Sequence, residues 1–515
     1  MPFFRKFAQV TFLFLGLLSL TAQNKDAYQQ LIADYMDQPS RYSEPWRAQY
    51  HFSPIKGWMN DPNGLFYKDG VWHLGYQHHI GGITTNTSWG YATSTDLLHW
   101  EHHPPMLYGK EGLAYWSGGA FVDHNNTSGL FDSDQGGVIA YYTIKDDTPE
   151  AEAEKGFQYV HIAYSNDDGK TWTDYDKNPI IPKIDTKGNR DPKVFYYDKT
   201  RQYYLILCEY EAGRTPIYAS ANLIDWQEVS AIDTITECPD LFPLPVNGDP
   251  NTIKWVFSRS TRYFDIGEFD GKTFTPQHHQ IANYGIDNVA GQSFDNAPDH
   301  RRVMISWMMY WNYGKLPLPN AGGHQTLITE ITLKEDREGL KVLQNPIEEY
   351  ETLRENKRVY KNIKIQGKDN LDNLRGKSIE IIAELDGTKA EEIGFEVFSD
   401  ARGSQKTKIG YDTVKNEVFV DRNESTTHDF KTEKSTYYQD KGRYAAPVST
   451  LNGKRVKLHL FLDHSTVEVF VNDGEQVINS IVFPDMDSDF IKAYTKGGTG
   501  KILNMEVYDM QSIWR

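Results

Sequence analysis

Three short motifs along the chain place a carboxylate next to residues that would fix its direction or its charge. Asp61 stands between Asn60 and a Pro-Asn-Gly turn, Asp191 follows Arg190, and Glu237 precedes a Cys-Pro pair. Taken singly, each motif has a plain structural explanation, because Asp-Pro-Asn-Gly suits a turn and Arg-Asp is often a surface ion pair. Brought together, three carboxylates would instead be able to break a glycosidic bond.

Cleavage of a glycosidic bond needs a proton on the leaving oxygen and help for an oxocarbenium-like centre. A retaining enzyme supplies one carboxylate as nucleophile and one carboxylic acid as proton donor, and acid-base help is worth about 10²–10⁴-fold in rate. We expect the Arg190 guanidinium to keep Asp191 charged. The sequence contains neither a Gly-rich phosphate loop nor a metal-ligand cluster, so we expect no cofactor and no metal.

A recurring segment indicates which elements must position these carboxylates. Each copy reads as a strand, a polar turn and an aromatic residue on the next strand, and the copies are Ala92–Trp100, Ala163–Trp172, Ala219–Trp226 and, more weakly, Phe269–Phe274. Their last residues are 72, 54 and 48 positions apart, a spacing that suits propeller blades built from strands. Four copies and an opening segment predict five blades. Ordinary hairpins with Asp-Gly turns are the alternative, but the shared Ala-x-Ser-x-Asp frame favours a repeat.

The candidate carboxylates follow these copies at comparable distances. Asp191 lies 19 residues after Trp172, and Glu237 lies 11 residues after Trp226. Each therefore falls where one blade ends and the next begins, which in a propeller is where the innermost strand lines the central channel. We expect Asp61, Asp191 and Glu237 to converge on one funnel although they are far apart in sequence.

The C-terminal third of the chain has a different pattern. Apolar and polar residues alternate over 456–462 and 467–471, which is typical of half-buried antiparallel strands and so of a β-sandwich. The segment 346–360 is charged and has the composition of a linker. The predicted fold is all-β, with a signal peptide at 1–22, a five-bladed β-propeller at 45–345, a linker at 346–360 and a β-sandwich at 361–515.

Composition and charge exclude several kinds of partner. The 515 residues include 71 acidic and 54 basic side chains, and the resulting net charge of −17 would repel nucleic acid. Cys208 and Cys238 are too few for a disulfide framework and form no zinc knuckle. Residues 1–22 combine a positive start, a short apolar run and small residues, and no lipid-attachment Cys follows. We therefore expect a secreted or periplasmic protein without a membrane span.

The three motifs, in this order, resemble family 32 of the glycoside hydrolases, which includes invertases, inulinases and levanases. Shorter stretches from about residue 51 to the end are also similar, among them the C-terminal Asp463-His-Ser465 with Glu468. The resemblance implies a five-bladed propeller followed by a sandwich. It further implies that Asp61 attacks C2 of a fructosyl unit, that Glu237 protonates the leaving group and that Asp191 stabilises the transition state.

The resemblance also implies a set of residues that line the fructose pocket. By position these are Asn60, Gln77, Trp89, Trp116, Ser117, Arg190, Tyr284 and Trp307. For the aromatic members, packing in the propeller core is the alternative, and Cys238 would tune its neighbour Glu237 without acting as a nucleophile. The chain departs from the family pattern at residues 78–80, Tyr91, Trp116 and Gly119. These residues border the pocket, so the preference among levan, inulin and sucrose stays open.

The activity implied is the release of terminal β-D-fructose from levan, inulin and sucrose by double displacement. An endo-acting fructanase and a fructosyltransferase of the same fold are alternatives. An inverting, arabinan-cleaving propeller would hold its carboxyl groups roughly 6.5–9.5 Å apart instead of about 5–5.5 Å. A non-catalytic sugar-binding propeller would lack at least one of the three carboxylates, whereas all three are present.

Overall fold

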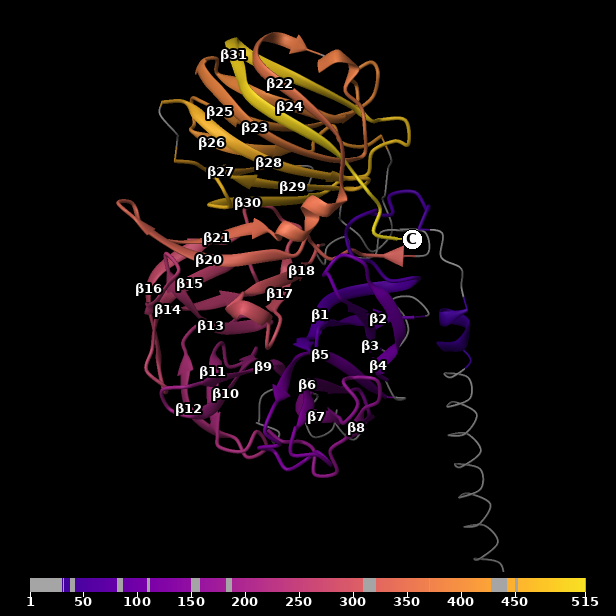
Figure 1. Ribbon diagram of the computed structural model, residues 1–515, viewed down its shortest axis with the longest axis vertical. Coiled ribbons are helices and arrows are strands. Elements are labelled where there is room, and N and C mark those ends of the chain that lie inside the picture. The colour runs from indigo at the N-terminus through magenta and orange to yellow at the C-terminus, as the bar shows by residue number, and fades with distance from the viewer. Residues whose placement is uncertain are drawn as a thin grey trace, which may run out of the picture.

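Figure 1 shows the computed structural model of the chain, in which a body of radiating sheets carries a second, layered body. The predicted signal peptide at 1–22 lies outside the described residues. Within them, residues 32–36 are helical, and no helix has the length and apolar character needed to cross a membrane. The structure describes residue 30 and the ranges 32–37, 42–80, 87–108, 112–149, 158–181, 188–308, 321–369, 371–427, 442–449 and 453–514.

In the described part of the chain, the first body consists of five four-stranded blades around one axis, which confirms the predicted propeller. The strand nearest the axis comes first in each blade. In chain order the blades comprise β1 (Gly57–Lys68), β2 (Val71–His79), β3 (Ser88–Ser94) and β4 (Glu101–Leu107); β5 (Leu113–Asp123), β6 (Gly137–Asp146), β7 (Gln158–Ser165) and β8 (Thr173–Asp174); β9 (Asn189–Tyr197), β10 (Gln202–Glu209), β11 (Thr215–Ser220) and β12 (Gln227–Ile232); β13 (Pro239–Val246), β14 (Asp249–Arg259), β15 (Tyr263–Phe269) and β16 (Phe274–Ile281); and β17 (Val289–Ser293), β18 (Val303–Trp307), β20 (Thr329–Asp336) and β21 (Gly339–Pro346).

The recurring segment of the sequence is the turn between the third and fourth strands of the first four blades. In the first blade the Ser94 hydroxyl donates to Asp96 at 2.9 Å, and Asp96 accepts the backbone N–H of Leu98 at 3.0 Å. Ser165 and Asp167 make the same contact at 2.9 Å in the second blade, and Ser220 with Asn222 repeats it at 3.1 Å in the third. These side chains cap the turn, which explains why the repeat is visible in the sequence.

The ring of blades closes where the last blade meets the first. The short strand β19 (Ala321–Gly322) runs parallel to the start of β1 and pairs Ala321 with Gly57. A 3-10 helix, η1 (Pro298–His300), joins β17 to β18. The seam therefore lies beside Gly57 and Trp58 at the start of β1, four and three residues before Asp61.

Polar residues join the five innermost strands at one level of the axis. Lys193 on β9 donates to the carbonyl of Ser293 on β17 at 2.5 Å, and the Ser293 N–H and hydroxyl donate to Asp240 on β13 at 2.8 and 2.7 Å. Asp295, just after β17, accepts the N–H of Val122 on β5 at 2.9 Å through its carboxylate, and its backbone N–H donates to the carbonyl of Leu65 on β1 at 2.9 Å. The side chains of Lys193, Asp240 and Ser293 are at most 3% exposed. We call Lys193, Asp240, Ser293 and Asp295 the girdle.

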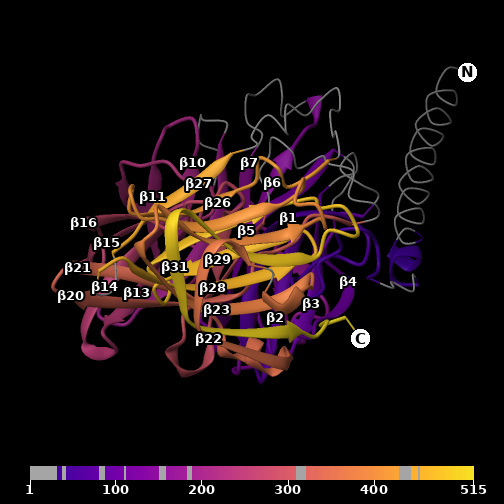
Figure 2. The same ribbon diagram turned by 90° about the horizontal axis from the view of Figure 1, so that it is seen from above.

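The second body is the predicted β-sandwich, and in Figure 2 its strands lie across the propeller. The long strand β31 pairs with three others, β22, β23 and β24, and so links the two layers. The apolar faces of both layers form one core. The sandwich comprises β22 (Arg354–Asp369), β23 (Ser378–Lys389), β24 (Glu392–Ser399), β25 (Thr407–Asp412), β26 (Glu417–Asp421), β27 (Arg443–Pro447), β28 (Arg455–Asp463), β29 (Thr466–Val471), β30 (Gln476–Ile481) and β31 (Phe490–Met510), with the 3-10 helix η3 (Leu371–Asn373).

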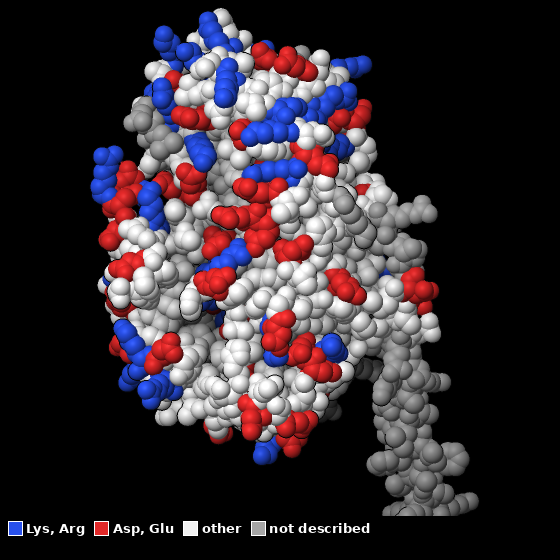
Figure 3. All heavy atoms as spheres, in the orientation of Figure 1, with Lys and Arg blue, Asp and Glu red and all other residues white. Residues whose placement is uncertain are grey.

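The segment 346–360, for which the sequence predicts a linker, is partly regular structure. It holds the 3-10 helix η2 (Glu348–Leu353) and the first residues of β22, which pairs along its length with β31. Most of these β22 side chains are exposed, and Figure 3 shows Lys and Arg side chains gathered over this upper part of the molecule. Charged side chains discourage edge strands from pairing with other chains, and they also make such a strand resemble a linker in sequence.

Candidate functional site

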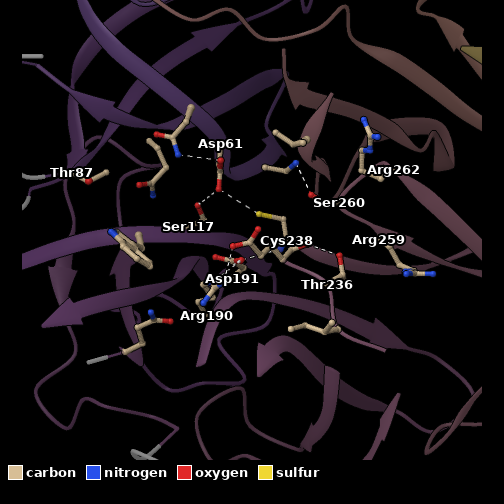
Figure 4. Close-up of a pocket in the computed structure, with 18 of the residues that line it drawn as sticks. Asp61, Thr87, Ser117, Arg190, Asp191, Thr236, Cys238, Arg259, Ser260 and Arg262 are labelled. Atoms are coloured by element: carbon tan, nitrogen blue, oxygen red, sulfur yellow. Dashed lines mark hydrogen bonds and ion pairs between the residues drawn. The ribbon is translucent and has the colours of Figure 1, made fainter. Parts of the chain in front are cut away.

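A cavity of about 820 Å³ opens near the N-terminal ends of the five innermost strands (Figure 4). The residues that line the cavity differ in exposure between its base and its mouth. The lining residues that are at most 6% exposed are Trp58, Asn60, Gln77, Thr87, Ser117, Asp191, Cys238 and Ala290. Glu237, by contrast, is 53% exposed. The three predicted catalytic carboxylates therefore share one cavity, with Asp191 deep within it and Glu237 towards solvent.

Irregular pairing of the innermost strands turns these side chains into the cavity. The register of β1 shifts between Met59 and Pro62, that of β5 between Trp116 and Gly118, and that of β17 between Val289 and Gln292. On β9 the shift falls between Arg190 and Lys193, a stretch that contains Asp191. A β-bulge adds a residue to one strand and redirects its side chain, so the bulges present Asp61, Ser117, Asp191 and Ala290 at one level.

Two of these bulges and the turn before β13 hold residues in the left-handed region of backbone conformation. Asp191 has φ of 60°, Ala290 has φ of 58° and Cys238 has φ of 44°. Each such non-glycine residue costs of order 1–3 kcal/mol and persists only where its surroundings impose it. Three such residues therefore stand in the wall of one cavity.

Asp61 is held by three donors. Its Oδ2 accepts the Ser117 hydroxyl at 2.6 Å and lies 3.5 Å from Cys238 Sγ, and its Oδ1 accepts Asn60 Nδ2 at 3.1 Å. Burial raises the pKa of Asp61, the Ser117 hydrogen bond opposes that rise, and the charge of Glu237 adds to it. The carboxylate is thus fixed in direction by hydrogen bonds that favour its ionised form.

Asp191 does not follow the expectation drawn from its neighbour Arg190. Burial raises the pKa of Asp191 to about 7, and the opposing effect of Arg190 does not cancel it. The physical reason is geometric: Arg190 Nε lies 3.9 Å from Asp191 Oδ2, whereas Arg190 Nη2 donates to Glu237 Oε1 at 2.7 Å. The backbone N–H of Cys238 supplies the close contact to Asp191, at 3.0 Å.

The raised pKa of Asp191 predicts that Asp191→Asn stabilises the protein at high pH while it lowers kcat. Because the folded value of about 7 exceeds the ordinary 3.8, the stability contribution of Asp191 is complete below pH 3.8 and is lost as the pH rises through 7. We expect Asn to raise the free energy of unfolding at pH 8.5 by up to about 4 kcal/mol, with little change at pH 4. Thermal melts of both proteins across this range, with kcat and KM on sucrose, measure both effects. An equal melting shift at both pH values would contradict the prediction.

Five of the eight predicted pocket residues line the cavity, namely Asn60, Gln77, Trp116, Ser117 and Arg190. Trp89, Trp307 and Tyr284 do not line the cavity. Trp89 is fully buried and its indole Nε1 donates to the carbonyl of Trp116 at 3.1 Å. Trp307 is also fully buried, edge-on to Trp58. Both rings pack behind residues of the cavity wall.

Tyr284 is drawn away from the cavity by the second domain. Its backbone N–H donates to the carbonyl of Val477 in the sandwich at 2.8 Å, and its ring packs against the sandwich core. The residue therefore belongs to the contact between the two bodies.

One wall of the cavity could not be predicted from the sequence motifs. Arg259, Ser260, Arg262 and Tyr263 line it from the hairpin between β14 and β15. The Arg259 guanidinium lies 4.8 Å above the ring of Tyr263, and Arg262 Nη1 donates to the carbonyl of Gly285 at 2.6 Å. Two arginines in a short turn of an otherwise acidic chain are the only signal that the sequence offered. Guanidinium groups of this kind donate well to the hydroxyls of a sugar.

Thr143, on β6, ties two of the site's strands together. Its hydroxyl donates to the carbonyl of Ser117 and accepts the N–H of Asp191, both at 2.9 Å, and its side chain is fully buried. We predict that Thr143→Val lowers kcat by about tenfold or more, because both bulges lose a shared partner. Thr143→Ser keeps the hydroxyl and should retain most of the activity. Equal losses in the two variants, measured as kcat on sucrose, would argue against this role.

Among the residues that the structure describes, no group of three or more His, Cys, Asp or Glu side chains could hold a metal ion. Burial raises the pKa of the Cys238 thiol well above its usual value, so this thiol stays protonated beside Asp61. The arrangement offers the three carboxyl groups of Asp61, Asp191 and Glu237, a bridging arginine and a deep polar pocket. It is suited to acid-base and nucleophilic chemistry on a small polar group.

Comparison with known proteins places this site among carbohydrate-active enzymes. The N-terminal domain model of the glycosyl hydrolases family 32 matches residues 51–346, and the C-terminal domain model of the same family matches residues 349–509. A levanase of Bacillus subtilis strain 168 is 38% identical over 505 residues, which cover 92% of this chain and 72% of the relative.

Two fungal proteins are similar over the same span. An extracellular exo-inulinase of Aspergillus niger is 32% identical over 523 residues, which cover 92% of this chain and 96% of the relative. The crystal structure of an exo-inulinase from Aspergillus awamori matches with a TM-score of 0.83 at 30% identity, covering 92% of this chain and 100% of that one.

Proposed function

Because the chain belongs to family 32 of the glycosyl hydrolases, we propose that it releases terminal β-D-fructose from levan and inulin, and also cleaves sucrose. The names of its relatives, levanase and exo-inulinase, support this substrate class. The description of the fungal relative as extracellular supports export of this protein as well. The substrate is neutral, in keeping with an acidic chain that would repel polyanions.

The proposed reaction is a double displacement. Asp61 attacks C2 of the terminal fructosyl unit while Glu237 protonates the leaving oxygen, and water then releases fructose with Glu237 acting as base. The Ser117 and Asn60 hydrogen bonds aim the Asp61 carboxylate. Arg190 donates to Glu237 and so connects Glu237 to the cavity wall beside Asp191. Asp191 accepts hydrogen bonds from hydroxyl groups of the fructosyl unit.

The observation that carries exo action is the closed lower end of the cavity. Asp191 precedes Lys193 by two residues and Cys238 precedes Asp240 by two, so the girdle lies directly beneath the deep carboxylates. The buried side chains of Lys193, Asp240 and Ser293 join β9, β13 and β17 across the axis, and Asp295 joins β5 and β1 to them. A pocket closed at its base admits the end of a fructan chain, whereas internal cleavage needs a groove that is open at both ends.

An early time course on levan and inulin tests the proposal. Free fructose should be the first and main product, and it should appear as the β-anomer because two inversions retain configuration. Oligosaccharides that precede free fructose would indicate endo action. Products longer than the substrate would indicate fructosyl transfer, and failure to turn over any fructoside would remove the proposed function.

A further inference from the structure

The sandwich motif that begins at Asp463 faces the propeller and takes no part in the reaction proposed above. His51, just before β1, lies between two of its carboxylates. His51 Nδ1 is 2.8 Å from Asp463 Oδ2, and His51 Nε2 is 2.8 Å from Glu468 Oε1. All three side chains are at most 1% exposed. We call His51, Asp463, Ser465 and Glu468 the clasp.

Within the clasp, His51, Asp463 and Glu468 form an ion triad, because each ring nitrogen of His51 lies 2.8 Å from a carboxylate oxygen. Burial lowers the pKa of His51, but the hydrogen bonds and charges of Asp463 and Glu468 outweigh burial and raise the pKa to about 9. Removing one member of a buried, hydrogen-bonded ion group leaves uncompensated charge and is strongly destabilising. The two bodies are therefore held in one fixed relation at this point.

The clasp also binds the backbone of two propeller segments that are far apart in sequence. Asp463 accepts the N–H groups of Gln49 and Tyr50 at 2.8 Å each, and Glu468 accepts the N–H of Leu327 at 2.7 Å. The Ser465 hydroxyl donates to a carbonyl of the first segment at 2.8 Å and lies 3.1 Å from a histidine ring of the second. The sandwich thus binds propeller segments on both sides of the seam at which the ring of blades closes.

Gln325 connects this seam to the catalytic strand. Its backbone N–H donates to the carbonyl of Phe52 at 2.9 Å, and its side-chain Nε2 donates to the carbonyl of Asn60 at 2.9 Å. That carbonyl belongs to the peptide that joins Asn60 to Asp61, so the hydrogen bond sets the plane of this peptide. Gln325 is fully buried, two residues from the Leu327 N–H that Glu468 binds.

We propose that the sandwich positions the nucleophile: the clasp fixes the segment 324–327, and Gln325 in that segment fixes the peptide that carries Asp61. Gln325 and Glu468 are positioning residues, since neither lines the cavity. The inference rests on the proposed role of Asp61. In this proposal the sandwich contributes to each turnover by positioning Asp61, and this contribution requires no ligand bound to the sandwich.

The test uses the full chain with Gln325→Met, which keeps the length of the side chain and removes the donor. The Gln325 Oε1 has no partner among the described residues, so the variant loses only the bond to Asn60. We expect kcat to fall about 10- to 100-fold with KM within twofold, because a displaced nucleophile affects the bond-forming step. The loss should be equal on sucrose and on an aryl fructoside whose leaving group needs no proton, since both reactions use Asp61.

Two further variants separate positioning from general loss of stability. Trp46→Phe removes a 2.8 Å hydrogen bond from the indole to Pro484 across the same contact, and it should lower the melting temperature without changing kcat. Glu468→Gln should lower kcat in the same way as Gln325→Met. The double variant of Gln325 and Glu468 should be no worse than Gln325→Met alone, because both act through one path.

The outcomes distinguish failure of the positioning role from failure of the proposed function. If wild-type protein cleaves fructosides while Gln325→Met keeps kcat within twofold, the positioning role is overturned and the proposed function stands. Additive losses in the double variant, or a fall in kcat for Trp46→Phe that matches its fall in melting temperature, would also overturn it. If wild-type protein cleaves no fructoside, the proposed function itself fails.

Discussion

Replacing Asp61 by Ala is expected to lower turnover of every fructoside by about 10⁴-fold or more, because no covalent intermediate can form without the carboxylate. The loss should be the same for sucrose, levan and an aryl fructoside, since all three require attack at C2. Steady-state rates of fructose or phenol release measure it. Mass spectrometry of wild-type protein quenched during turnover should find one fructosyl unit on the peptide that contains Asp61.

Ser117→Ala provides the matched control. It removes the 2.6 Å hydrogen bond to Asp61 but leaves the carboxylate in place. We expect its loss to be far smaller, because a hydrogen bond to a charged group is worth about 1.5–3 kcal/mol. Residual activity of Asp61→Ala within tenfold of wild type would reject Asp61 as the nucleophile.

Replacing Glu237 by Ala is expected to divide substrates by their leaving groups. Sucrose and fructans should lose about 10²–10⁴-fold in kcat/KM, because their alkoxide leaving groups need a proton. Aryl fructosides with acidic phenols should form the covalent intermediate at nearly the normal rate. For them the release of fructose should become the slow step, since Glu237 also activates water. A burst of phenol followed by a slow steady rate is the expected signature.

Glu237→Gln is the control for the ion pair with Arg190. The Gln oxygen can still accept from the Arg190 guanidinium, which now lies 2.7 Å from Glu237 Oε1, but the amide cannot donate a catalytic proton. Gln and Ala should therefore show the same division of substrates. If Gln restores activity on sucrose, the role of Glu237 is to hold Arg190 and not to transfer a proton.

The sequence was sufficient to predict the fold and to predict that the three carboxylates share one cavity. The Ser-x-Asp turns recur because each caps the same hairpin, and the motif carboxylates converge because each stands at the start of an innermost strand. Aromatic residues were less predictable. Trp89 and Trp116 are the same residue type in similar motifs, but Trp89 is fully buried whereas Trp116 lines the cavity. This difference depends on how the whole fold packs around each ring.

Features that depend on three-dimensional neighbours were beyond the sequence. The pKa of Asp191 follows from burial and from the turning of Arg190 towards Glu237, and neither is visible in an Arg-Asp pair. Arg259 lines the cavity from a hairpin that carries no motif. The charged composition of residues 346–360 predicted a linker, because the side chains of an exposed edge strand and those of a linker both face solvent and are similar in sequence.

The girdle has a consequence for the order in which molecules come and go. Since buried side chains such as Lys193 and Asp240 fill the axis beneath the site, fructose cannot depart through the propeller and must return through the mouth by which it entered. The shortened polymer occupies that mouth after bond cleavage, so it has to dissociate before water reaches the intermediate and before fructose escapes. We therefore expect each chain to be released after losing a single unit, so that attack is distributive and a population of chains shortens evenly while free fructose competes with every chain end for the same entrance.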